Sequence, residues 1–201
     1  MDCFVKRSDP EHLFPPRSLR RLLPYFHHRR CSWLQTSCNL SMESFIQTSG
    51  LQTADFISSP EIGFLKSLKA KTAKERSSRT KLFLVFQDKN ATEPTSNKTY
   101  DSIVSNLSEL KPFVNGIVVP KDYIWPVNAA GYIDSSTTLV SDAHKLGLQV
   151  FVNGFANDMI GVYNYSYDPS AEYLQFVDNS QFSVDGFITD FPPTASQVVC
   201  K

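Results

Sequence analysis

The feature that most constrains the fold is a repeated order of segments: an apolar run, a polar loop, then a stretch with helical periodicity. Apolar runs cover 82–86, 113–120, 148–152 and 186–189, and the loops that follow the first three are long and polar. The run LFLVF at 82–86 is continuously apolar, which suits a strand buried on both faces of a parallel sheet. Alternation of this kind predicts parallel strands joined by helical crossovers. We therefore expect an α/β fold with its functional residues after the strands.

Punctuating residues predict where several elements begin and end. A further strand is expected at 54–58, followed by a helix with Ser59 as its cap and Pro60 at its first position. Gly147 is expected to end the helix before 148–152, and Pro169 to open the next one. In the closing stretch VDGFITDFPP the two prolines are interpreted as a stop after the strand.

Length and charge limit the classes of function. A chain of 201 residues can form one good-sized domain, or part of a (β/α)8 barrel, which typically needs about 250. The net charge of zero offers no global field for nucleic acid or anionic lipid. No apolar run approaches the roughly 18–20 residues of a membrane span. The four cysteines form no CxxC pair, so neither a zinc site nor a disulfide framework is predicted.

Composition divides the chain near residue 40. Residues 1–40 are basic and rich in proline, and we expect them to be disordered or, alternatively, to include a basic amphipathic turn at 17–26 that could serve as a membrane-surface or targeting element. Residues 41–200 look globular and are expected to form the folded domain.

Glycosylation sequons suggest a secretory history. The candidate glycosylation sites are Asn90, Asn97, Asn106 and Asn164, with a further match at Asn39. The N-terminal residues contain no apolar segment typical of a signal peptide, and no apolar tail that would signal a GPI anchor follows Lys201. We expect an extracellular or cell-surface location, with neither targeting signal encoded in this chain.

Several stretches together resemble a known family. They are GIVVPKDYIWPVNA, DAHKLGLQVFVNGFAND, YNYSYDPSAEYLQFVDN and FSVDGFITDFPPTAS. The chain is similar to the C-terminal half of a glycerophosphodiester phosphodiesterase domain, and most of all to the plant cell-surface branch of that family. The resemblance is continuous from about residue 82 to 200 and weaker back to 41. It implies a partial (β/α)8 TIM barrel that comprises roughly strands five to eight with their helices.

The resemblance also implies a chemistry. The family hydrolyses glycerophosphodiesters to glycerol 3-phosphate and an alcohol, in lipid and glycerol metabolism, with a divalent metal such as Ca²⁺ or Mg²⁺. Two histidines act as acid and base, and carboxylates hold the metal, which suits a reaction that builds negative charge and moves protons. Those groups lie in an H-R-G motif and an E-x-D motif that do not occur here. We therefore predict no catalytic or metal-ligating residue in this chain, and no metal bound by it. His144 is interpreted as a helix-end surface residue.

The second half of the family pattern can be carried over. A family loop that often contains W-T-x-N-D matches residues 154–158, where the tryptophan is absent and Asn157 and Asp158 remain. The closing I-T-D-F-P pattern is kept through Asp190. The candidate substrate-binding residues all follow predicted strands: Lys121, Asp122, Trp125, Asn157, Asp158 and Asp190.

Each candidate also has a structural interpretation. Lys121 and Asp122 could meet a phosphate, or form salt bridges within the loop. Trp125 could stack on a glycerol moiety, or pack beneath the loop. Asn157 and Asp158 could bind substrate or cap a turn, as Asn and Asp often do. Asp190 could support the site or cap the turn after its strand.

Two functions from different classes stay open. One is a phosphodiester hydrolase whose partner is a small glycerophosphodiester. The other is a truncated, catalytically inactive cell-surface or cell-wall protein, or a fragment without function. Neither involves nucleic acid or a transmembrane segment. Four parallel strands alone would leave two open sheet edges, so self-association of two copies through those edges is a further possibility.

Overall fold

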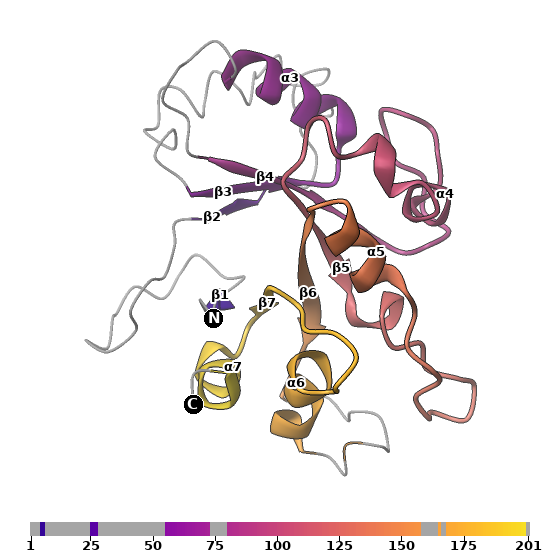
Figure 1. Cartoon of the computed structure of the whole chain (residues 1–201), viewed down its shortest axis with the longest axis vertical. Helices are drawn as coiled ribbons and strands as arrows, with labels where there is room; N and C mark the ends of the chain where they lie inside the picture. Colours follow the sequence, from indigo (N-terminus) through magenta and orange to yellow (C-terminus); the bar gives the residue numbers. More distant parts are fainter. Residues whose placement is uncertain are drawn as a thin grey trace. The chain divides into compact units, whose positions relative to one another are not determined.

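The structure, a computed structural model, describes residues 5–6, 25–27, 55–72, 80–157, 165 and 168–199. Its parallel strands and intervening helices form an α/β fold of the partial TIM-barrel type, as the sequence predicts (Figure 1). The strands are β1 (Val5–Lys6), β2 (Tyr25–His27), β3 (Phe56–Ser59), β4 (Lys81–Val85), β5 (Gly116–Pro120), β6 (Gln149–Phe155) and β7 (Gly186–Thr189). The helices are α3 (Ile62–Thr72), α4 (Tyr100–Val104), η2 (Leu107–Glu109), η3 (Lys121–Tyr123), α5 (Leu139–Lys145), α6 (Pro169–Val177) and α7 (Pro192–Val199).

The chain divides into two compact units, which are described separately. The β3–β4 unit comprises Leu23–Val118 and Leu146–Leu148. The β6–β7 unit comprises Met1–Leu22, Val119–Lys145 and Gln149–Lys201.

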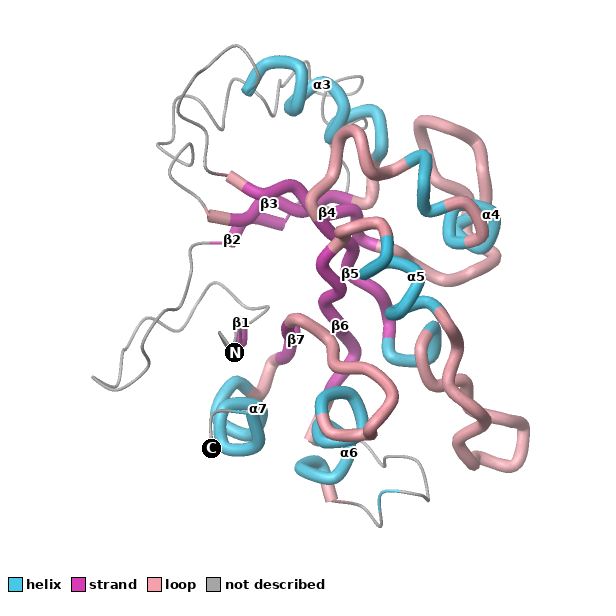
Figure 2. Tube along the Cα trace, in the orientation of Figure 1, coloured by secondary structure: helices cyan, strands magenta, loops and turns pink. Residues whose placement is uncertain are grey.

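The β3–β4 unit is built on strands in the order β5-β4-β3-β2, all parallel. Figure 2 shows β2, β3 and β4 side by side. Leu82, Phe83 and Leu84 are buried on both faces of β4, as expected from the unbroken apolar run. Helix α3 contributes Leu65 to this core and packs on β3 and β4.

Helix α3 begins later than the sequence predicts. Ser59 still belongs to β3, and the helix starts at Ile62 rather than Pro60. The cap comes from a distant loop, because the side chain of Glu93 accepts the N–H of Ile62 at 2.9 Å. Ser59 instead accepts the N–H of Glu61. A long-range cap of this kind leaves no local signal in the sequence.

The spacing of Ile103, Val104, Leu107 and Leu110 predicts one helix after the polar loop at 87–101, but the structure has two separate pieces. Val104 is only partly buried. Thr99 caps α4, its side chain accepting the N–H of Ser102, and the helix ends at Val104. Asn106 has a non-helical backbone, with φ −133° and ψ 56°, so the next turn forms as the separate 3₁₀ helix η2. The apolar residues Ile103, Leu107 and Leu110 nevertheless all reach the core, as their spacing predicts.

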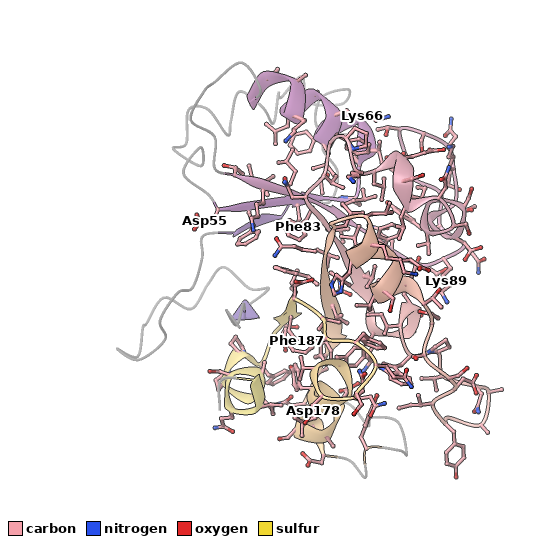
Figure 3. All side chains as sticks on the ribbon, viewed as in Figure 1. Asp55, Lys66, Phe83, Lys89, Asp178 and Phe187 are labelled. Atoms are coloured by element: carbon pink, nitrogen blue, oxygen red, sulfur yellow. The ribbon has the colours of Figure 1, made fainter. Side chains whose placement is uncertain are left out.

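The β6–β7 unit has the strand order β6-β7-β1, also parallel. Its core is aromatic. The Phe155 ring lies 4.4 Å from that of Tyr173 and 5.0 Å from that of Phe187, between centroids. Phe176 meets Phe155 edge-on at 5.2 Å. Phe187, labelled in Figure 3, is central to these contacts. Each such pair contributes about 0.5–1.5 kcal/mol beyond its burial.

The closing strand lies where the sequence predicts, but the segment after it differs from the prediction. The strand β7 covers 186–189. The strand does end before the two prolines, but Pro192 also opens helix α7, which the sequence analysis did not predict and which packs against α6 and β7. Proline lacks an N–H that the first helical position does not need, so the same residue can end a strand and begin a helix.

The sequence analysis expects four parallel strands with two open edges. In the structure, the outer strands instead pair with further short strands. Among the described residues, five strands, β3 to β7, are joined by two short ones that fall within residues 1–40. The strand β2 pairs with β3, and β1 pairs with β7. No helix in the described part of the chain is long and apolar enough to cross a membrane.

Candidate functional site

Three of the predicted site residues lie directly beyond strand ends. Lys121 follows β5 as the first residue of η3, Asn157 lies two residues after β6, and Asp190 follows β7. All three belong to the β6–β7 unit. The carboxyl ends of parallel strands are where α/β proteins place binding and catalytic groups. Asp158 lies outside the described residues.

Lys121 forms an ion pair that the sequence analysis did not name. Its Nζ lies 2.5 Å from Oε1 of Glu172, a residue in the first turn of α6. The Glu172 side chain is only 6% exposed, and that of Lys121 is 35% exposed. The ammonium therefore joins a buried carboxylate on one side and remains reachable by solvent on the other. Lys121 therefore forms a salt bridge with a helix rather than within its own loop, and the pair uses one of the three ammonium N–H donors.

A bulge in β6 lies beneath the Lys121 side chain. Pairing between β6 and β7 shifts register between Asn153 and Phe155. Gly154, at the bulge, is exposed and has φ +94°, a conformation that side chains rarely adopt. A Cβ at this position would lie 3.9 Å from Cγ of Lys121. The aliphatic part of the Lys121 side chain therefore passes over the β6 backbone at Gly154, where there is no side chain.

Asn157 has one amide atom paired and one unpaired. Its Nδ2 donates to Oγ1 of Thr194 on α7, at 2.7 Å. Its Oδ1 is buried without a hydrogen-bond partner. Exchanging the amide nitrogen and oxygen would leave a nitrogen unpaired instead, so one buried polar atom is unused under either assignment. Buried polar atoms are rarely left unpaired, which makes this atom a candidate ligand contact.

The other two described candidates, Trp125 and Asp122, differ from Lys121 and Asn157 in their surroundings. The Trp125 ring lies 5.9 Å from that of Phe182, in the segment before β7, so it makes a packing contact there. Its Nε1 is nevertheless buried without a partner. Asp122 is exposed in η3.

A buried hydroxyl pair supports the strand ends. The hydroxyl of Tyr173 and Oγ1 of Thr189 are 2.6 Å apart. Burial raises the pKa of Tyr173 above its ordinary value, and the nearby carboxylates of Glu172 and Asp190 raise it further, against a lowering contribution from the Thr189 bond. Tyr173 therefore stays neutral and ties α6 to β7. Asp190 is itself exposed, next to this pair in the chain.

Glu172 and Thr194 are the residues that sequence reasoning missed. A signal existed for Glu172, because it lies one turn before Phe176 and thus shares the apolar face of α6. A carboxylate on an apolar face implies a buried partner. Thr194 could not be found in this way, since α7 itself was not predicted.

No metal centre forms among the described residues. They contain no group of three or more His, Cys, Asp or Glu side chains placed to hold an ion. Two of the buried carboxylates already have partners: Glu93 accepts hydrogen bonds and Glu172 pairs with Lys121. These residues do not fit a catalytic Ca²⁺ or Mg²⁺.

His144 lies at the other end of the strands. It is an exposed residue in the last turn of α5, as predicted. Its Nε2 is 2.9 Å from Oδ2 of Asp185, which also accepts the N–H of Val150 near the start of β6. Asp185 directly precedes β7, so this histidine serves the amino ends of β6 and β7 and does not join Lys121 and Asn157.

Comparison with known proteins gives close relatives. No protein-family model matches the chain. Glycerophosphodiester phosphodiesterases GDPDL7 and GDPDL6 of Arabidopsis thaliana are each 55% identical over 160 residues, which is 80% of this chain and 21% of each relative. Protein SUPPRESSOR OF NPR1-1 CONSTITUTIVE 4 of the same plant is 50% identical over 162 residues, 80% of this chain and 14% of that relative.

The chain spans about a fifth of the length of the first two relatives. Identity above one half across four fifths of the chain agrees with the resemblance carried by the residues at 154–158 and 188–192. The chain therefore belongs to the plant glycerophosphodiester phosphodiesterase-like family.

Proposed function

We propose that this chain binds a glycerophosphodiester beyond the carboxyl ends of β5, β6 and β7. We further propose that it takes part in hydrolysis of this ligand to glycerol 3-phosphate and an alcohol, a reaction of lipid and glycerol metabolism. The observation that carries the proposal is the buried, unpaired amide atom of Asn157 beyond β6. The relatives named as glycerophosphodiester phosphodiesterases supply the ligand class.

The chemistry of the strand-end residues fits the two parts of such a ligand. A phosphodiester carries a negative charge, and the ammonium of the partly exposed Lys121 side chain can donate to its oxygens. Glycerol carries hydroxyl groups, and the unpaired Oδ1 of Asn157 can accept one of them. Asp158 and Asp190 are proposed to line the same site, with Asp122 and Trp125 at its margin.

Turnover is a separate claim from binding. Hydrolysis of a phosphodiester calls for a cation and for an acid and a base that move protons. The described residues do not fit a metal site, and no step of the reaction is assigned to them. What they do is bind the ligand and orient its phosphate and glycerol ends.

The test uses the purified full chain with glycerophosphocholine, in the presence of Ca²⁺ or Mg²⁺. Calorimetry measures binding, and release of glycerol 3-phosphate measures turnover. We expect Asn157→Ala to weaken binding at least about tenfold, the effect of one lost hydrogen bond in a desolvated site. Asn90→Ala, an exposed asparagine in the other unit, is the control and should bind as the wild type does. Equal binding by wild type and Asn157→Ala would refute the assignment.

A second candidate is a binding protein without catalysis. The observation that favours it is the position of His144, which pairs with Asp185 at the amino ends of the strands. Binding of glycerophosphocholine without release of glycerol 3-phosphate would establish this alternative. Metal-dependent release would exclude it.

We also propose an extracellular or cell-surface location with N-linked glycans. Asn90, Asn97 and Asn106 are all exposed, and Asn164 lies outside the described residues. Asn106 is already engaged, because its Nδ2 donates to Glu109 and its Oδ1 accepts from Ser108. We expect glycans at Asn90 and Asn97 before Asn106. Expression in plant secretory cells, followed by glycosidase treatment and peptide mass spectrometry, tests this order.

A further inference from the structure

We propose that Glu172 is a positioning residue for Lys121: its buried carboxylate holds the ammonium over the bulge of β6, where the ammonium meets the phosphate of the ligand. This inference rests on the proposed binding function and goes beyond it, because Glu172 itself touches no ligand. It assigns the anion contact to an ion pair rather than to a free surface lysine.

Lys121 and Glu172 form a close ion pair. The Nζ of Lys121 and Oε1 of Glu172 are 2.5 Å apart, and the carboxylate is almost fully buried. A buried carboxylate requires a partner, since an unpaired charge is costly in a medium of low polarity. Among the described residues, Lys121 is the cation that pairs with this carboxylate. The lysine is thus fixed at one end while a third of its side chain stays exposed.

The helix turn that carries Glu172 is held in place by a cap and by contacts to two strands. Asp168 caps α6 and accepts the N–H of Ser170, and Pro169 occupies the first helical position. The next residue, Tyr173, stacks on Phe155 of β6 and bonds to Thr189 of β7. The helix turn that carries Glu172 is therefore fastened to both strands, as a positioning residue requires.

The surface under Lys121 is backbone that carries no side chain. At Gly154 the β6 backbone is exposed and has no side chain, and the Lys121 stem passes over it. An ammonium has three N–H donors, of which Glu172 takes one. The remaining donors can reach a phosphate, and an already ordered lysine loses less conformational freedom when the anion binds.

An exposed ion pair in the β3–β4 unit, Lys98–Glu109, provides a matched control for the Lys121–Glu172 pair. Lys98 and Glu109 lie 2.9 Å apart, but both side chains are at least half exposed. Exposed pairs of this kind contribute little to order or stability. Glu109→Gln therefore removes the same charge without affecting Lys121.

The experiment titrates the full chain with inorganic phosphate, followed by phosphorus NMR, and separately with glycerophosphocholine. We expect Glu172→Gln to weaken phosphate binding about tenfold or more, the loss expected from one misplaced charged hydrogen bond. Lys121→Met should abolish binding, and Glu109→Gln should leave it unchanged. Removal of a negative charge beside a lysine should by itself favour an anion. Unchanged or tighter phosphate binding by Glu172→Gln would therefore overturn the inference, as would no binding by the wild type.

Two outcomes separate this inference from the proposed function. If phosphate binding depends on Glu172 but glycerophosphocholine does not bind, the positioning role stands and the proposed ligand is wrong. If glycerophosphocholine binds equally to wild type and Glu172→Gln, the proposed function stands and the positioning role is wrong. Should Glu172→Gln fail to fold, Glu172→Asp keeps the charge with a side chain one methylene shorter. It should weaken phosphate binding, and wild-type affinity would overturn the inference.

Discussion

A single buried carboxylate organises the longest described loop of the β3–β4 unit. Glu93 is fully buried and accepts the backbone N–H of Ile62 and the hydroxyl of Thr95, at 2.9 and 2.7 Å. It also accepts the N–H of Ser96. Thr95 Oγ1 in turn accepts the N–H of Gly63. The loop at 92–99 thus caps the first turn of α3, and a negative charge is favourable at that helix end.

Replacement of Glu93 should destabilise the protein. Glu93→Gln keeps the size of the side chain but replaces an acceptor oxygen with a donor that faces other donors. We expect a loss of about 1.5–3 kcal/mol in the free energy of unfolding, the range for hydrogen bonds to a charged group. Urea denaturation measures this loss. Glu109→Gln, at an exposed carboxylate, is the control and should leave the midpoint unchanged. A midpoint for Glu93→Gln equal to that of the wild type would contradict the capping role.

The same residue predicts a dependence of stability on pH. Burial alone raises the pKa of Glu93, but hydrogen bonds from Ser96, Thr95 and the N–H of Ile62 outweigh it, so the pKa lies below its ordinary value. A lowered folded-state pKa gives stability that is complete above the unfolded value, about 4.3. That stability is lost as the pH falls through the folded pKa.

We therefore expect the stability difference between wild type and Glu93→Gln to shrink below the unfolded pKa, about 4.3. Urea midpoints at neutral pH and at several acidic pH values test the direction. A difference that stays constant, or that grows in acid, would show that the Glu93 carboxylate is not the titrating group.

At the scale of elements, α6 depends on its cap. The side chain of Asp168 accepts the N–H of Ser170 at 2.8 Å, while Asp178 at the other end makes no side-chain cap. Asp168→Ala should cost about 1 kcal/mol. Asp178→Ala removes the same charge from the negative end of the helix dipole and should be neutral or slightly stabilising. Thermal unfolding of both variants compares them, and equal shifts would argue against a specific cap.

The bulge in β6 gives a second prediction for an element. Gly154 has φ +94°, which strains any residue that carries a Cβ. Gly154→Ala should lower the free energy of unfolding by about 1–2 kcal/mol. Gly154→Asn should cost less, because asparagine tolerates positive φ better than alanine does. The reverse order in denaturant midpoints would show that the space beside Lys121, rather than the backbone, limits this position.

At the scale of the whole molecule, edge pairing determines association. The expected open edges of β3 and β7 are each paired with a short strand, β2 and β1. Short outer strands are poor templates for another chain. We expect a monomer by size-exclusion chromatography with light scattering at micromolar concentration. A concentration-dependent dimer would instead support the self-association that open sheet edges suggest.

The class of fold follows from the sequence because it depends on local periodicity. The unbroken apolar run at 82–86 and the glycine–strand–proline order at 186–192 each mark an element whose type hardly depends on its neighbours. Gly147 ends α5 with φ +74°, as a glycine in that place should. Pro169 stands at the start of α6, which the sequence also predicts.

The element boundaries that the sequence analysis did not predict correctly depend on distant contacts. The start of α3 is set by Glu93, 31 residues away, and no local pattern reports it. Helix α7 follows from prolines that serve a strand and a helix at once. Its Thr194 then orients Asn157, which sequence spacing cannot show.

The sequence by itself determined the parallel α/β class, the family and the strand-end positions of Lys121, Asn157 and Asp190. Only the tertiary structure decided that Lys121 is paired with Glu172, that Asn157 keeps one polar atom unused, and that His144 serves the opposite strand ends. The physical reason is the distance along the chain over which each kind of interaction acts. Periodicity and turn chemistry act over a few residues, whereas the pairing of a buried charge is decided by whichever residue the fold brings to it.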